Sequence, residues 1–68
     1  MTDYVYKSVE ITGTSTDGVT EAIDRAVAKA SETLRNLDWF EVVNVRGNIT
    51  DGKVDHFQVT LKLGFRLE

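Results

Sequence analysis

The sequence predicts an α+β fold, in which a β-α-β-β chain forms a three-stranded antiparallel sheet packed on one helix. Apolar and polar residues alternate in Tyr4–Ile11 and again in Phe57–Leu67, which is the two-residue period of a strand. Between these segments, apolar residues recur at helical spacing from Val19 to Leu34. The Asp51-Gly52 pair supplies the positive backbone dihedral angles of a tight hairpin turn. All 68 residues are expected to form a single domain.

A polar, turn-rich stretch, residues 12–18, separates the first strand from the helix. Its side-chain oxygen atoms are candidates to accept hydrogen bonds from the free amides of the helix, and Glu21 suits the helix dipole. The apolar stripe of the helix is rich in alanine, which allows close approach to a sheet. It consists of Val19, Ala22, Ile23, Ala26, Val27, Ala30 and Leu34.

The second strand, Asn36–Gly47, and the third are joined by the predicted turn, so they are adjacent and antiparallel. In the third strand every second residue from Phe57 to Leu67 is apolar, and this face should meet the helix. A right-handed crossover leaves the first two strands parallel with a gap between them. The third strand fills that gap.

Composition points to a protein that associates with other copies of itself. A chain of this size buries only about 60% of the surface that its unfolded form exposes. With no cysteine and one histidine, disulfides and structural metals are effectively excluded as further support, and association remains. The net charge of −3 and the scattered lysines and arginines argue against nucleic acid as a partner. No stretch reaches transmembrane length and no export signal is evident, so we expect a cytoplasmic protein.

The first and second strands carry large apolar residues at both odd and even positions. Tyr4 and Tyr6 lie out of phase with Val5 and Val9, and the second strand contains Trp39-Phe40. One helix covers one face, so we infer that other copies of the chain close the helix-free face. The alternative is a β-bulge in the second strand, which would change the face to which each side chain points.

Four polar or aromatic side chains form a candidate binding site: Trp39, Arg46, Gln58 and Arg66. An indole, an amide and a guanidinium group suit a flat heteroaromatic ligand that carries a phosphate. The alternative is that Trp39 is an interface anchor that binds no ligand, because tryptophan is enriched in interface hot spots.

Several segments resemble the dodecin family, small flavin-binding proteins of bacteria and archaea. The resemblance implies a β-α-β-β protomer, a hollow dodecamer of cubic symmetry, and flavins bound in antiparallel pairs between tryptophans of neighbouring subunits. The segments that carry it are Val5–Glu10, Gly13–Ser15, Leu37–Gly47, Gln58-Val59 and Gly64–Leu67.

The resemblance also assigns roles to residues. It implies that Trp39 stacks on the flavin, that Gln58 bonds to the edge of the isoalloxazine, that Arg46 contacts the ligand, and that Asp38 lies beside the site. By resemblance Arg46 indicates the bacterial branch of the family, which favours FMN, with riboflavin or FAD as alternatives. Some bacterial members also bind coenzyme A, and the positions that match are Tyr6, Lys29, Thr33 and Arg66.

The sequence indicates no catalysis. His56 has no acid or nucleophile at an evident spacing, so a surface role is favoured over that of a general base. Asp51 and Asp55 are explained by turn formation and solvation without a metal. Three functions remain: a protein that sequesters flavin and quenches its excited state, a carrier of both FMN and coenzyme A, and a structural oligomer that binds no ligand.

The hairpin register tests the flavin hypothesis. With a strict two-residue turn and a regular ladder, Arg46 and Gln58 would point to opposite faces of the sheet. A longer loop or a bulge would bring them to one face, and flavin binding requires this second arrangement.

Overall fold

The computed structural model describes residues 3–67 and has the predicted β-α-β-β order. Strand β1 (Tyr6–Ser15) is followed by helix α1 (Val19–Ala30), and strands β2 (Leu37–Thr50) and β3 (Lys53–Arg66) form a long hairpin. The sheet order is β1-β3-β2, with both neighbouring pairs antiparallel. The predicted α+β fold, including the central position of the third strand, is confirmed.

The elements differ from the predicted ones mainly at their ends. Strand β1 continues through Ser15, since residues 12–15 pair with β3 and do not form the predicted turn. No side chain caps the start of α1, although several were candidates; the residue at this position is Gly18. The helix ends at Ala30, before Leu34, because the amides of Glu32 and Thr33 bond to carbonyls three residues earlier.

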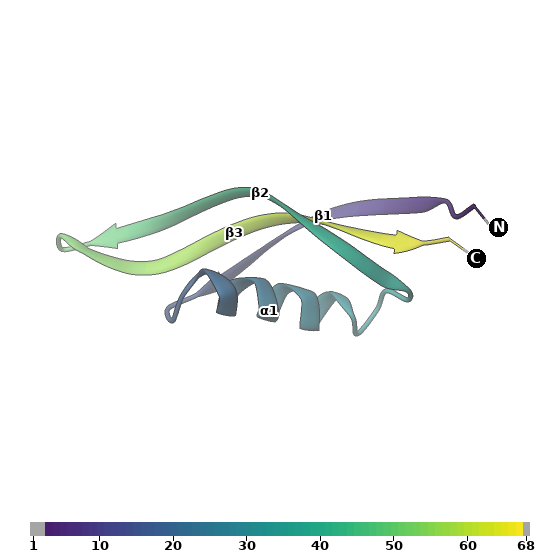
Figure 1. The fold of residues 1–68 in the computed structure, drawn as a ribbon. Helices are drawn as coiled ribbons and strands as arrows, with labels where there is room; N and C mark the ends of the chain where they lie inside the picture. Colours follow the sequence, from purple (N-terminus) through teal and green to yellow (C-terminus); the bar gives the residue numbers. More distant parts are fainter. Residues whose placement is uncertain (1–2, 68) are drawn as a thin grey trace.

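The core lies between α1 and the two strands β1 and β3 (Figure 1). Ala22 and Ala26 of the helix pack against the central strand, whose apolar face is buried in its middle part. A Cβ atom at Gly13 would overlap the backbone of Ala22, so this glycine allows the close approach of helix and sheet. The buried residues of the core are Ala22, Ala26, Val59, Leu61 and Leu63.

The β2–β3 hairpin extends well beyond the helix. In Figure 1 its tip lies at the opposite end of the molecule from the start of β1 and the end of β3. The tip is the predicted turn: Asp51 and Gly52 have φ angles of 53° and 75°, both positive as a type I′ turn requires. Strand β2 is therefore largely uncovered, and Leu37 is its only residue that is partly buried against the core.

Three irregularities interrupt the pairing of β2 with β3. Asp38 and Val43 have no pairing partner on β3, and Asp55 has none on β2. As a result Phe40, Val42 and Val45 all lie opposite core residues of β3 and share the helix side of the sheet. The bulges explain the run of apolar residues on consecutive positions.

The inference that the helix-free face is a large apolar surface is therefore wrong. That face is lined mostly by polar side chains, among them Glu10, Thr12, Glu41, Asn44, Thr60 and Lys62, and its large aromatic residues are Tyr6 and Trp39. The exposed apolar surface lies on the helix side of β2, beyond the edge of α1, where Phe40 and Val45 are each 50% exposed. Counting alternate positions failed because it assumes an unbroken strand.

Candidate functional site

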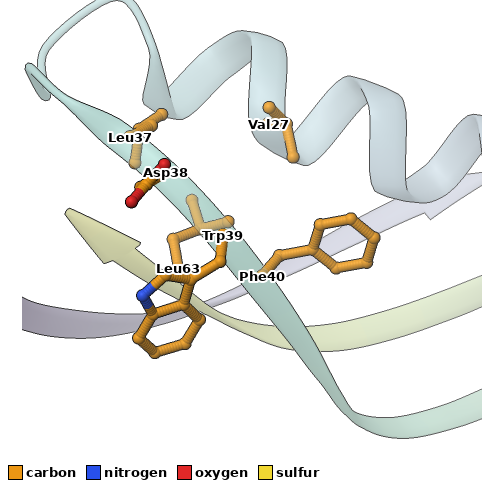
Figure 2. A pocket seen from close by; sticks show the side chains of 6 residues that line it. All are labelled: Val27, Leu37, Asp38, Trp39, Phe40 and Leu63. Atoms are coloured by element: carbon orange, nitrogen blue, oxygen red, sulfur yellow. The ribbon is translucent and has the colours of Figure 1, made fainter.

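The single tryptophan lies flat on the central strand. Trp39 pairs with Gly64, and a Cβ atom at Gly64 would overlap the indole ring. Figure 2 shows the indole on the side of β2 away from α1. It is 43% exposed, so one face rests on the sheet while the other can accept a planar ligand. A glycine within an otherwise regular strand is the sequence signal that allows an indole to approach the backbone this closely, and sequence reasoning missed it.

Tyr6 and Asp38 flank the indole. The hydroxyl of Tyr6 donates a hydrogen bond of 2.7 Å to Oδ2 of Asp38. The Tyr6 and Trp39 rings have centroids 6.3 Å apart and are tilted by 57°, within the range of edge-to-face aromatic pairs. The hydrogen bond to Asp38 raises the pKa of Tyr6, because ionising the phenol would break it. Sequence reasoning placed both residues in candidate sites but did not connect them.

Arg46 and Gln58 are direct partners across β2 and β3. Residues directly opposite each other point to the same face, and this pair shares the helix-free face with Trp39. The two-residue turn is present, and the bulge at Asp55 shifts the register by one residue. The structure thus has the arrangement that flavin binding requires. Thr14 lies opposite Gln58 on the other side and extends the polar row.

Trp39 and the Arg46–Gln58 pair are far apart within one chain. Gln58 is six positions before Gly64, the partner of Trp39, on β3, and the pairing with β1 is unbroken over this stretch. At about 3.3 Å per residue the two groups lie about 20 Å apart. A planar three-ring ligand stacked on the indole does not reach the Arg46–Gln58 pair of the same chain.

The candidate residues for coenzyme A fall on both sides of the sheet. Lys29 and Thr33 line a shallow cavity of about 340 Å³ between α1 and β1, and the Lys29 ammonium lies 3.8 Å from Glu32. The guanidinium of Arg66 lies over the ring of Tyr4 at 4.8 Å. Tyr6 is on the helix-free face, opposite Arg66. The structure brings Lys29 together with Thr33, and Tyr6 together with Trp39.

The remaining polar candidates are at the hairpin end. His56 Nδ1 is hydrogen-bonded to Asp55 at 2.7 Å, and Asp51 forms the turn. Across residues 3–67 no group of three or more potential metal ligands comes together. In the same part of the chain, no helix is long and apolar enough to cross a membrane.

An apolar hollow of about 140 Å³ opens at the edge of the helix, where β2 leaves the core. Val27 lines it from α1, and the sheet contributes Leu37, Asp38, Trp39, Phe40 and Leu63 (Figure 2). The hollow adjoins the exposed apolar surface of β2. It has few polar groups to orient a small ligand.

Comparison with known proteins agrees with the fold. The family model described as Dodecin matches residues 5–68. This chain belongs to the dodecin family.

A curated dodecin from Thermus thermophilus is 55% identical over 64 residues, which cover 94% of this chain and 93% of that protein. The structure of dodecin from Streptomyces coelicolor has a TM-score of 0.93 and 60% identity, covering 100% of this chain and 97% of that one. Dodecin from Streptomyces davaonensis gives 0.93 and 52%, with 98% of each chain covered. Structures similar to this chain also include variants of the Thermus dodecin in which a tryptophan is replaced by phenylalanine or an arginine by alanine.

Proposed function

We propose that this dodecin binds a flavin, FMN in particular, and holds it without chemical turnover. The observation that carries the proposal is the indole of Trp39, which rests on Gly64 with its other face exposed. An isolated surface tryptophan loses this orientation readily, whereas an indole supported by the sheet is prepared for stacking. The existence of tryptophan and arginine variants of the Thermus relative fits a role for these residue types in this family.

The polar pair supplies what stacking alone lacks. Gln58 has an amide that both donates and accepts, which suits the carbonyl and NH groups at the edge of an isoalloxazine. Arg46 offers a planar guanidinium for the anionic part of FMN. Because the two residues are direct partners on adjacent strands, they present these groups side by side.

The separation of about 20 Å requires that the site be shared between copies of the chain. Trp39 of one subunit would stack on the flavin, and Arg46 and Gln58 of a neighbouring subunit would bind its polar groups. The exposed apolar surface of β2 supports such assembly, because exposed apolar patches on small proteins favour association. The dodecamer typical of the family is the proposed assembly.

Storage and quenching follow from contact with the indole. A photoexcited flavin stacked on Trp39 accepts an electron from the indole and returns to its ground state by the reverse transfer. No proton donor, nucleophile or metal is needed for this process. We therefore propose a protein that sequesters flavin and protects it from photochemistry, and not an enzyme.

The test is a titration of the ligand-free protein with FMN, monitored by flavin fluorescence. We expect saturable quenching that is reversed on denaturation. Trp39→Ala should weaken binding at least tenfold, corresponding to about 1.4 kcal/mol, because the stacking surface is lost. Lys53→Ala, at the exposed turn, is the matched control and should bind as the wild type does. A wild-type protein that leaves FMN fluorescence unchanged would refute the proposal.

Coenzyme A is a second candidate ligand, supported by the cavity that Lys29 and Thr33 share. The lysine ammonium would pair with a phosphate group at the cavity rim. Mass spectrometry of the small molecules released from the purified protein distinguishes the cases. Coenzyme A in the extract of the wild type, and its loss in Lys29→Ala, would support the dual carrier; an extract that holds flavin alone would contradict it.

A further inference from the structure

We infer that Tyr6 and Asp38 act together as a clamp that fixes the plane of the Trp39 indole, so that Tyr6 is a positioning residue of the flavin site. The effect of the clamp on flavin binding rests on the proposed function. The orientation of the indole does not, because it can be measured in the protein without ligand.

The clamp joins the two outer strands of the sheet. Tyr6 belongs to β1 and Asp38 to β2, with β3 between them. Their 2.7 Å hydrogen bond therefore spans the central strand. On β3 the residue paired with Tyr6 is Arg66, and Gly64, two positions earlier, leaves the space in which the indole lies beside this link.

Asp38 reaches across because it is the bulged residue of β2. The pairing passes from Leu37–Phe65 to Trp39–Gly64, and Asp38 is left without a partner on β3. A bulge turns a side chain away from its regular direction, and here the carboxylate is directed to the phenol of Tyr6. The residue that follows the bulge is Trp39, so the clamp and the indole share one short piece of backbone.

The indole is then held on three sides. Gly64 lies beneath it, the Tyr6 ring contacts it in a tilted arrangement, and the backbone of β2 is restrained by the bond at Asp38. The N-terminal end of β1 is itself tied to β3, because the amide of Leu67 donates to the carbonyl of Val5 at 2.8 Å. A side chain whose rotamer is restrained before binding loses less entropy when the ligand arrives. The clamp is thus expected to act through Trp39 and not through contact with the flavin.

The experiment compares five full-length variants: Tyr6→Phe, Asp38→Ala, Asp38→Asn, the double variant Tyr6→Phe/Asp38→Ala, and Tyr4→Phe as the matched control. The first readout is the near-ultraviolet circular dichroism of the ligand-free protein, where the only tryptophan gives an unambiguous signal. We expect the tryptophan band to weaken in Tyr6→Phe and Asp38→Ala and to remain in Tyr4→Phe. Asp38→Asn keeps an oxygen acceptor for the phenol and should retain most of the band.

The second readout is the affinity for FMN. Tyr6→Phe and Asp38→Ala should each weaken binding about fivefold, and the double variant should lose no more than either single one, because one bond is removed in all three.

A merely structural role would lower the melting temperature and leave the tryptophan band and the affinity unchanged, which would overturn the inference. Additive losses would overturn it too, since they would mean that Asp38 contacts the flavin by itself. If the wild type fails to bind FMN, the proposed function falls, and the tryptophan band alone decides on the clamp.

Discussion

At the scale of single residues, the candidate site depends on a glycine. Gly64 is the partner of Trp39 and leaves the space in which the indole lies. The ring gains contact with the sheet on one face and keeps the other exposed. A side chain at this position of the central strand would push the ring into solvent and remove its fixed orientation.

We therefore expect Gly64→Ala to impair flavin binding through Trp39. The added methyl group overlaps the indole, and such overpacking costs about 1–3 kcal/mol of folding stability. The tryptophan band in near-ultraviolet circular dichroism should collapse, and FMN affinity should fall at least as far as in Trp39→Ala. Unchanged FMN affinity in Gly64→Ala would show that packing of the indole against Gly64 has no part in binding.

The pKa of Tyr6 leads to a prediction about pH. Its hydrogen bond to Asp38 raises the pKa above the usual value of a phenol. The contribution of this bond to stability is fully present at neutral pH and is lost as the pH rises through the raised pKa of the folded protein. In a Tyr4→Phe background, tyrosinate absorbance should show Tyr6 titrating above the pKa of a free tyrosine. Asp38→Ala should lower that pKa, and a titration at the same pH in both proteins would contradict the account.

At the scale of the elements, the bulges decide which side chains share a face. Val54 and Phe57 have opposite parity in the sequence, yet both belong with the helix side of the hairpin once Asp55 is left unpaired. The same residue brings Arg46 opposite Gln58 while the turn at Asp51-Gly52 keeps its two-residue form. The one extra residue on β3 thus allows a two-residue turn and also places Arg46 opposite Gln58.

Deletion of Asp55 should consequently be tolerated. Without it the ladder passes directly from the Ile49–Val54 pair to the Asn48–His56 pair, and the register of Arg46 and Gln58 is retained. We expect a change in unfolding free energy of less than about 1 kcal/mol and normal FMN binding. Deletion of Thr60, which is paired on both sides, should instead prevent folding, because half of β3 would present its polar side chains to the core. Thermal unfolding of the two variants checks this, and equal damage in both would contradict the assigned register.

Strong local patterns were enough to predict the fold. The alternation in β3, the alanine-rich stripe of α1 and the Asp51-Gly52 turn each follow from a rule of local geometry, and the structure contains all three. The faces of β2 were not predictable in the same way, because a bulge depends on how two strands fit together. For the same reason the pairing of Tyr6 with Asp38 was missed: the two residues are 32 positions apart and meet only across the folded sheet.

At the scale of the whole molecule, the chain is elongated and its core is small. Its dimensions are 54 × 20 × 15 Å, and the half of the hairpin beyond the helix has little to pack against. Ile49 and Val54 at the tip are 76% and 62% exposed. Apolar exposure on this scale, together with candidate ligand contacts about 20 Å apart, is explained by one arrangement. Neighbouring copies would cover the apolar surface of β2 and would complete each flavin site.

The most direct test of this shared site is complementation between two inactive variants. Trp39→Ala and Gln58→Ala chains, with different affinity tags, are produced together, and assemblies that contain both are purified and titrated with FMN. Each variant alone should bind weakly. In a random mixture half of the subunits carry Trp39 and half carry Gln58, so about a quarter of the shared sites should be intact and should quench FMN with wild-type affinity. Mixed assemblies that bind no better than the separate variants would place the whole site within one chain and contradict the account.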